Sequence, residues 1–255
     1  DFEIVPPRPY EGECEQHGKF AGRISVIVGR EFKSGCPECQ KEREEQKARE
    51  EQEKQAMLDR MEIASKLRRA AIPARFTDKT FESFIAETDR QRKALDSCKG
   101  YAEAFTEHYR DGRCLMLMGK PGCGKTHLGA AIALYLCRET KYTAVYRTLP
   151  GLISDIRSTY DRSEEFSEAD IMRTITRCSL LVLDEIGATK TSEFELALLF
   201  NVINARYEDK LPTVIISNLP PAELKTAIGD RCVDRLREGG GIVVGFDWES
   251  KRGEL

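Results

Sequence analysis

The stretch MGKPGCGKTHLG, Met118 to Gly129, decides the fold of this 255-residue chain. From Gly119 it reads glycine, any four residues, then Gly-Lys-Thr, which is the complete phosphate-loop pattern of proteins that bind nucleoside triphosphates. An apolar run precedes the stretch, and a segment with helical character follows it. A glycine-rich turn would rarely meet all these conditions by chance. The stretch therefore predicts a strand, a phosphate-binding loop and a helix, in that order.

Each residue type in this loop suits a phosphate group. Glycines let the backbone fold around phosphate oxygens, and the next helix presents free N–H groups and the positive end of its dipole. Lys125 supplies a charge for the β- and γ-phosphates of ATP, and Thr126 offers its hydroxyl to Mg²⁺. The predicted nucleotide-binding residues of the loop are Gly119, Lys120, Pro121, Gly122, Cys123, Gly124, Lys125, Thr126 and His127.

Apolar runs along the second half of the chain predict an α/β fold. The candidate buried strands are Cys114–Met118, Thr143–Arg147, Leu180–Leu183, Thr213–Ser217 and Ile242–Phe246. Longer segments with helical character separate the first four of them. Alternation of this kind is typical of a parallel sheet with helices on both faces.

A second acidic element completes the expected magnesium site. In SLLVLDEIG, an apolar run leads into Asp184 and Glu185. Asp184 would hold Mg²⁺ through water, and Glu185 could polarise the attacking water. An apolar strand ending in Asp-Glu is weak by itself, but its place after the phosphate loop favours hydrolysis of ATP over binding alone.

Composition limits where the protein works. One third of the residues are charged (33%), and the formal net charge of −3 argues against a wholesale nucleic-acid coat. No apolar run approaches the roughly 20 residues that a membrane span needs. Nine cysteines, an odd number, indicate reduced thiols in a cytosol rather than a disulfide framework. We therefore expect a cytoplasmic protein, with no membrane partner.

Two close pairs of soft ligands suggest a zinc site near the N-terminus. Cys14-x2-His17 is followed, after a hairpin-sized spacer, by Cys36-x2-Cys39, a set that suits tetrahedral Zn²⁺. A redox dithiol is the rival interpretation, but the first 40 or so residues cannot supply the βαβ domain that such a dithiol needs. Unrelated cysteines are the third alternative. The six other cysteines are expected to be packing residues.

A charged segment separates this region from the rest. Residues 41 to about 70 contain no Gly or Pro and mix both signs of charge, which predicts a helix. Its second half gains enough apolar residues to pack on one side: Met57, Leu58, Met61, Ile63 and Leu67. The expected organisation is a zinc-binding N-terminal domain (1–42), a helical linker (43–72) and an ATPase domain (73–255).

From Pro73 onward the chain resembles the AAA+ ATPases of the DnaC/IstB type, the bacterial and phage loaders of replicative helicases. The resemblance is carried by IPARFTDKTFESF, GKPGCGKTHLGAAI, LLVLDEIG, PTVIISN, GDRCVDRLR and FDWESKR. It implies a sheet of five parallel strands, and ATP hydrolysis in a ring or spiral of subunits, each of which puts an arginine into its neighbour's ATP site. No full lid domain is expected, because only three residues follow Arg252.

The resemblance also assigns site residues. Asn218 matches the sensor that positions the attacking water, although an amide after a strand is also an ordinary turn residue. Arg235 matches the trans-acting arginine finger, with Arg231 and Arg237 near enough to replace it and a solvated helix face as the alternative. Arg252 matches the arginine that senses the γ-phosphate of its own chain.

The segment between the second and third strand candidates corresponds to helices that contact single-stranded DNA in such loaders. Arg157, Tyr160, Arg162 and Arg173 offer cations and one aromatic ring, the combination that tracks a phosphate backbone and stacks a base. Acidic residues lie between them, so a plain surface helix remains the alternative.

Three functions are compatible with these features. The first is an ATP-dependent loader that places a hexameric replicative helicase on single-stranded DNA, gripping it through the N-terminal domain. The second is an IstB-like transposition helper that binds DNA and directs a transposase. In the third, a DNA-binding adaptor, ATP only stabilises the fold, and Glu185 argues against it.

Overall fold

The computed structural model describes residues 6–27, 29–159, 167–187 and 192–250. The chain divides into two compact units, Asp1–Glu62 and Ile63–Leu255, which we treat separately. The second unit thus begins inside the segment that we expected to be a linker. Among the described helices, none combines the length and the apolar character needed to cross a membrane.

The first unit begins with a three-stranded antiparallel sheet. The strands are β1 (Arg8–Cys14), β2 (Gly18–Ile27) and β3 (Arg30–Lys33), in the order β1-β2-β3. The β1–β2 turn is closed by the pair Cys14 and Gly18, and Gly18 adopts the left-handed φ of +72° that favours glycine. From the sequence, only the apolar run that begins at Ile24 predicts a strand in this region. The other strands are missed because their side chains are mostly exposed and give no apolar alternation.

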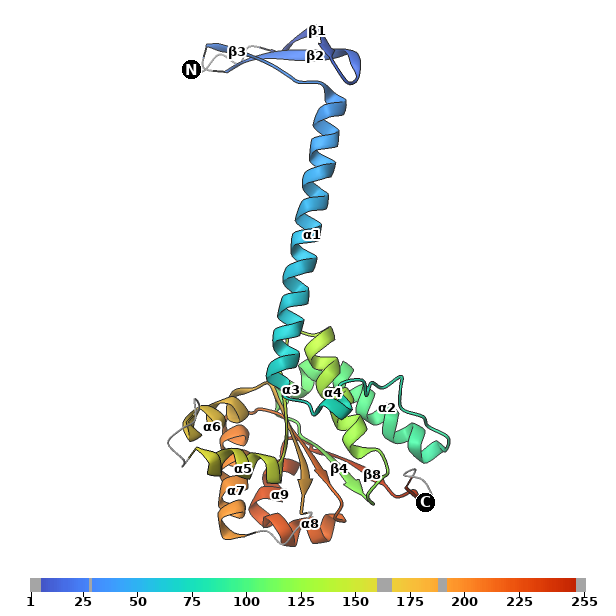
Figure 1. Ribbon diagram of the computed structural model, residues 1–255, viewed down its shortest axis with the longest axis vertical. Coiled ribbons are helices and arrows are strands. Elements are labelled where there is room, and N and C mark those ends of the chain that lie inside the picture. Colours follow the sequence, from blue (N-terminus) through green and yellow to red (C-terminus); the bar gives the residue numbers. More distant parts are fainter. Residues whose placement is uncertain (1–5, 28, 160–166, 188–191, 251–255) are drawn as a thin grey trace. The chain divides into compact units, whose positions relative to one another are not determined.

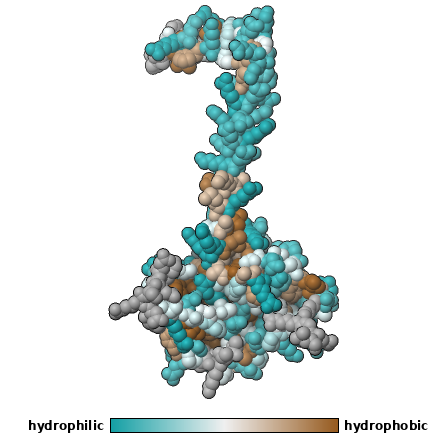
Figure 2. All heavy atoms as spheres, viewed as in Figure 1, coloured by the Kyte–Doolittle hydropathy of each residue, from teal (hydrophilic) through white to brown (hydrophobic). Residues whose placement is uncertain are grey.

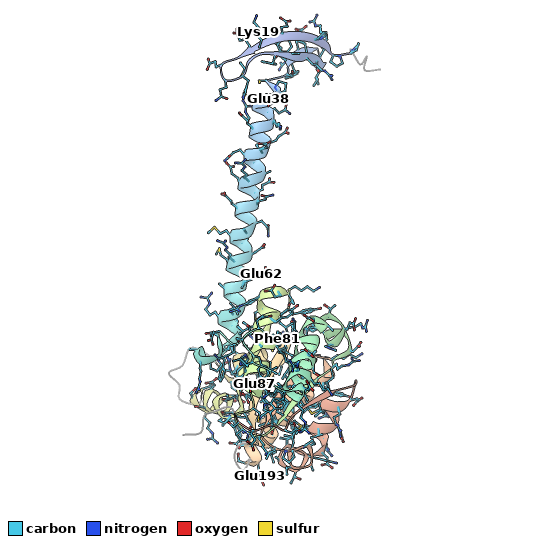
Figure 3. All side chains as sticks on the ribbon, turned by 90° about the vertical axis from the view of Figure 1, so that its right-hand side faces the viewer. Lys19, Glu38, Glu62, Phe81, Glu87 and Glu193 are labelled. Atoms are coloured by element: carbon cyan, nitrogen blue, oxygen red, sulfur yellow. The ribbon has the colours of Figure 1, made fainter. Side chains whose placement is uncertain are left out.

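Helix α1 (Pro37–Ala70) follows and starts before the predicted linker does, with Pro37 at a favourable first position. Up to Glu62 its side chains project into solvent (Figure 3), and most are hydrophilic (Figure 2). Pairs at i,i+4, such as Gln46 with Glu50, support it. Met57, Leu58 and Met61 are exposed, so the predicted packing is wrong for these three.

The last turns of α1 belong to the second unit. Leu67 packs against the buried core, Ala70 is fully buried, and Lys66 donates from Nζ to the carbonyl oxygen of Thr140 at 2.9 Å. The helix ends where Ala71 turns to a φ of +50°, two residues before Pro73. The core of the second unit thus fixes this end of the helix.

The second unit is built on a five-stranded parallel sheet (Figure 1). Its strands, in the order β5-β6-β7-β4-β8, are β4 (Leu115–Gly119), β5 (Ala144–Thr148), β6 (Leu180–Ile186), β7 (Thr213–Ser217) and β8 (Ile242–Phe246). Each overlaps a predicted strand, and β7 and β8 match the predicted bounds. The predicted fold class is confirmed.

Side chains alternate along each strand, so each strand presents apolar residues to both faces of the sheet. Helices therefore cover both faces. On one face, Leu115, Leu117 and Val182 pack with α2 (Asp89–Glu103), α3 (Phe105–Asp111) and α4 (Lys125–Glu139). The opposite face is covered by α5 (Leu149–Ser158), α6 (Glu168–Arg177), α7 (Glu193–Glu208), α8 (Pro221–Ile228) and α9 (Asp230–Arg237). A short helix, η1 (Ala74–Phe76), precedes α2.

The strand order determines which strand ends meet. β7 lies between β6 and β4, so the carboxyl end of β7 separates the phosphate loop, after β4, from the acidic residues at the end of β6. Ligands of open parallel sheets bind at this edge. The predicted nucleotide site therefore has its parts at one edge of the sheet.

Candidate functional site

The phosphate loop has the backbone of an anion cradle. Gly122 and Gly124 adopt left-handed φ values of +80° and +88°, and Gly124 directly precedes α4. Gly119 allows close approach, because a Cβ there would lie 2.0 Å from the carbonyl oxygen of Phe246. The free N–H groups of the helix start thus face the loop, as a phosphate group requires.

Lys125 is buried beneath this loop. Its Nζ donates to the carbonyl oxygens of Gly119 and Lys120 at 2.7 and 2.6 Å. These contacts hold the ammonium group against the loop backbone, where phosphate oxygens would become its partners. The residues fit the predicted nucleotide.

The expected magnesium ligands contact each other across the sheet. Thr126 donates from Oγ1 to Oδ2 of Asp184 at 2.8 Å, and the buried hydroxyl of Tyr146 donates to the same oxygen. The backbone N–H of Glu185 donates to Oδ1 of Asp184 at 2.6 Å. A hydroxyl and a carboxylate are the oxygen ligands that Mg²⁺ prefers. The arrangement fits a divalent cation.

Glu185 has an unusual backbone beside this pair. Its φ is +62°, and the pairing of β6 with β7 shifts register between Leu183 and Ile186. Such bulges redirect a side chain at active sites. Asp184 is buried while Glu185 is exposed, so one carboxylate is available to hold metal and the next to face a water molecule.

Asn218 lies one residue beyond β7. Ser217 donates from Oγ to the carbonyl oxygen of Ile186 at 2.7 Å, which ties the end of β7 to the end of β6. Asn218 is exposed and follows directly. The structure thus brings it to the edge that carries the loop, Asp184 and Glu185.

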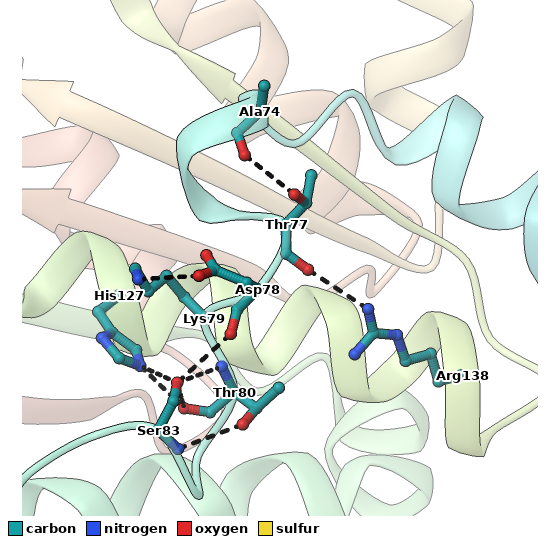
Figure 4. Close-up of polar contacts among 8 residues, drawn as sticks. All are labelled: Ala74, Thr77, Asp78, Lys79, Thr80, Ser83, His127 and Arg138. Carbon is teal, nitrogen blue, oxygen red and sulfur yellow. Dashed lines mark hydrogen bonds and ion pairs between the residues drawn. The ribbon is translucent and has the colours of Figure 1, made fainter.

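The segment before α2 docks beside the loop. His127, on the first turn of α4, places Nε2 2.8 Å from the carbonyl oxygen of Thr80 and 3.2 Å from Oγ of Ser83 (Figure 4). The Phe84 ring meets His127 edge-on, and a Cβ on Gly124 would lie 2.6 Å from this ring. Burial lowers the pKa of His127, so its imidazole holds this segment as a neutral group instead of supplying charge to phosphate.

The chain after β8 also lies against the loop. Cys123 donates from Sγ to the carbonyl oxygen of Trp248 at 2.8 Å, and the Trp248 ring packs on Phe246. Arg90 and Asp247 form an ion pair at 2.7 Å. Arg252 lies outside the described residues, so its predicted sensor role stays a prediction.

Arg235 lies far from the phosphate loop of its own chain. It lines a cavity of about 390 Å³ together with Cys114 and Thr213, which stand where β4 and β7 begin. Its guanidinium stacks over Phe200 at 4.6 Å and Tyr207 at 5.6 Å, and its buried Nη1 has no hydrogen-bond partner among the described residues. Aromatic faces thus hold the cation while Nη1 keeps its hydrogen-bonding capacity.

Two of the four predicted DNA-contacting residues, Arg157 and Arg173, lie within the described part of the chain. Tyr160 and Arg162 lie outside the described residues. Arg173 is exposed but pairs with Asp170 at 3.2 Å. Arg157 lies 6.0 Å from the ring of Phe194, an aromatic side chain that is 41% exposed at the start of α7. Phe194 was not predicted to contact DNA, although the sequence shows this aromatic residue soon after the pair Asp184-Glu185.

The four predicted zinc ligands converge. Their ligand atoms, Sγ of Cys14, Cys36 and Cys39 and one ring nitrogen of His17, all lie within 4.8 Å of one another. Nδ1 of His17 lies 3.3, 3.7 and 3.8 Å from the three sulfurs, and the Cys14 and Cys39 sulfurs are 3.4 Å apart. A tetrahedron with Zn–S near 2.3 Å and Zn–N near 2.0 Å has edges of about 3.5–3.8 Å. The spacing fits zinc.

Further contacts support these ligands. Backbone N–H groups of Gln16 and His17 donate to the Cys14 sulfur and lower the pKa of its thiol to about 6. His17 places Nε2 3.2 Å from a carboxylate oxygen of Glu42, which fixes the ring with Nδ1 toward the sulfurs. Carboxylates commonly orient metal-binding histidines in this way. The six remaining cysteines, Cys98, Cys114, Cys123, Cys137, Cys178 and Cys232, are all buried and unpaired, as expected of packing residues.

Known proteins are similar to this chain over most of its length. The family model described as "IstB-like ATP binding protein" matches residues 41–236, which leaves the zinc-ligand segment outside. The replicative helicase loader DnaC of Buchnera aphidicola (subsp. Schizaphis graminum) is 31% identical over 192 residues, 75% of this chain and 76% of that protein. DnaC of Escherichia coli K12 is 31% identical over 176 residues, covering 69% and 70%.

Solved structures share the fold. The crystal structure of the DnaC helicase loader matches with a TM-score of 0.61 at 21% identity, covering 68% of this chain and 99% of that one. The DnaI structure matches with a TM-score of 0.58 at 20% identity, covering 71% and 95%. The family match spans more than half of the chain, and it agrees with the resemblance seen in the motifs. The chain therefore belongs to the IstB/DnaC family of ATP-binding proteins and is an AAA+ ATPase of that family.

Proposed function

We propose that this protein is an ATP-dependent loader of a replicative helicase onto single-stranded DNA, with ATP hydrolysed between copies of the chain. The observation that carries the proposal is the 31% identity to DnaC loaders over three quarters of both chains. These relatives are named as helicase loaders, which favours loading over the transposition-helper alternative. The acidic pair Asp184 and Glu185 beside the phosphate loop favours hydrolysis over a purely structural use of ATP.

Each residue of the predicted nucleotide site, at the carboxyl edge of the parallel sheet, has one role in this proposal. Lys125 and the N–H groups at the start of α4 bind the β- and γ-phosphates, and Thr126 and Asp184 hold Mg²⁺. Bound Mg²⁺ neutralises charge that develops on the phosphate oxygens. Glu185 polarises the attacking water, and Asn218 orients it from the neighbouring strand. Trp248 and the segment around Phe84 flank the loop.

Arg235 acts on another copy in this proposal. It lies where β4 begins, whereas the phosphate loop lies where β4 ends, and four steps of about 3.3 Å separate these points by about 13 Å. An arginine at the amino edge can therefore reach γ-phosphate only in a neighbouring copy. Head-to-tail contacts of this kind generate rings or spirals.

Single-stranded DNA is the proposed polymer because of the pairing of Arg157 with Phe194. A guanidinium beside an exposed ring tracks the backbone and stacks a base without reading sequence. This assignment extends the predicted set, Arg157, Tyr160, Arg162 and Arg173, by one aromatic residue.

Replacing Phe194 with alanine is expected to weaken binding of a fluorescent oligo(dT) by about tenfold, since stacking of one base contributes roughly 1–3 kcal/mol. Phe194→Tyr should retain most of the affinity because the ring remains. Fluorescence anisotropy at fixed salt measures both variants. Equal affinity of wild type and Phe194→Ala would remove this residue from the DNA path.

The N-terminal unit is the proposed helicase-binding part. Its three strands and its four zinc-ligand residues precede the family match, which begins at residue 41, and the ligand cluster supports a separately folded zinc module. The test is a loading assay with the hexameric helicase recovered from host lysate on the immobilised full chain. With ATP, wild type should transfer that helicase to circular single-stranded DNA, detected as co-elution of helicase and DNA on gel filtration. Recovery of a transposase without a helicase would favour the transposition helper instead.

A further inference from the structure

A tyrosine hydroxyl is buried beside the predicted magnesium ligands. Tyr146, on β5, is 1% exposed and belongs to the apolar core that α4 covers. Its hydroxyl donates to Oδ2 of Asp184, the oxygen that also accepts from Thr126. Neither the phosphate-loop pattern nor the acidic motif contains this residue.

The register of the sheet explains how the phenol reaches that carboxylate. Tyr146 pairs with Val182, and Asp184 follows two residues later on β6, so both side chains lie on the same face. Two residues of about 3.3 Å along the strand and a strand spacing of about 4.8 Å place such diagonal neighbours about 8 Å apart, which a long aromatic side chain can span. A valine or leucine at this position would fill the core without reaching Asp184.

The surroundings keep the phenol a donor. A carboxylate oxygen only accepts hydrogen bonds, so the phenol donates its O–H to Oδ2 of Asp184. Asp184 itself is only 4% exposed. A buried carboxylate needs its oxygens hydrogen-bonded, and here Thr126, Tyr146 and the N–H of Glu185 all donate to it.

A role in packing alone does not account for this geometry. A buried tyrosine hydroxyl can bond to a backbone carbonyl, as Tyr101 does with Arg113 at 2.8 Å in the same core. The hydroxyl of Tyr146 instead meets the one carboxylate predicted to hold the metal. It donates to Oδ2 together with Thr126, while the N–H of Glu185 donates to Oδ1, so the carboxylate cannot rotate about its terminal bond without losing a donor.

We infer that Tyr146 is a positioning residue that orients Asp184 for Mg²⁺, so that the metal site of this protein is built from Thr126, Asp184 and Tyr146 together. The inference rests on the proposed role of Asp184 in ATP hydrolysis. It adds the residue that determines how tightly the metal is held. Partners that orient a metal ligand typically contribute about 10–100-fold in metal affinity.

The test uses the full chain carrying Tyr146→Phe, which keeps the ring and removes only the hydroxyl. Mn²⁺ binding in the presence of a non-hydrolysable ATP analogue is followed by electron paramagnetic resonance. We expect Mn²⁺ affinity to fall about tenfold or more. Binding of the same analogue without metal should stay within about twofold, since the phosphate loop is untouched. The Mg²⁺ concentration for half-maximal ATP hydrolysis should rise in parallel.

Tyr101→Phe is the matched control, because it removes an equally buried hydroxyl bond outside the site. Unchanged Mn²⁺ affinity in Tyr146→Phe, or an equal loss in both variants, would overturn the inference. Failure of wild type to load a helicase would remove the proposed function but leave the Mn²⁺ result intact. The two failures are therefore distinguishable.

Discussion

Replacing Cys36 with serine is expected to abolish zinc binding and to unfold the strands β1 to β3 while the ATPase unit stays folded. Among the described residues 6–27 and 29–62, only Gly22 and Cys36 are buried, so this unit has almost no apolar core. Small units with so little apolar core need an additional stabilising link, such as a bound metal ion or a disulfide. Structural zinc sites contribute on the order of 10–16 kcal/mol, far more than the edge-on contact of Tyr10 and Phe20 can provide.

Metal content by mass spectrometry and amide dispersion by NMR measure this effect. Glu42→Gln is the graded control, since it removes only the carboxylate behind His17 and should lower zinc affinity by about 10–100-fold without abolishing it. ATP binding should be unchanged in both variants. Wild-type protein purified without chelator and lacking near-stoichiometric zinc would contradict the assignment, as would a folded Cys36→Ser unit.

The sequence predicted the fold wherever burial leaves a periodic signal. The buried runs at Thr213–Ser217 and Ile242–Phe246 are strands with the predicted bounds, and the family confirms the resemblance read from the motifs. Strand order was not predicted, because periodicity shows that a strand is buried and not which strand lies beside it. The strands β1 and β3 were missed because their side chains are mostly exposed and leave no apolar alternation.

Site residues could be predicted where a motif fixes their spacing along the chain. Lys125, Thr126 and Asp184 follow from such patterns, and the structure brings them together. Tyr146 could not be found in this way, since its link to Asp184 depends on the register of two strands. Arg206 is a similar case: it is fully buried and donates to the carbonyl oxygens of Ile175, Cys178 and Pro212, a structural role that no local pattern indicates.

Mixing two inactive variants should restore ATP hydrolysis if Arg235 acts in a neighbouring copy. Arg235→Ala is expected to lose about 10³-fold or more in turnover, the contribution of an arginine that stabilises phosphoryl-transfer charge. Glu185→Gln is expected to be inactive in its own site while still presenting Arg235. In an equal mixture, about one site in four combines an intact Glu185 with a neighbour's intact Arg235. Steady-state phosphate release on single-stranded DNA measures the recovery.

Arg237→Ala is the matched control, because Arg237 is exposed on the same short helix and lacks the aromatic contacts of Arg235 with Phe200 and Tyr207. It should retain most of the wild-type rate. If Arg237→Ala or Arg231→Ala loses activity instead, the finger is a different residue of α9. If the mixture of Arg235→Ala and Glu185→Gln stays inactive although the two variants co-assemble, Arg235 does not act in trans. In that case its stacking against two rings is a contribution to the fold alone, since the amino edge of the sheet is out of reach of the chain's own phosphate loop.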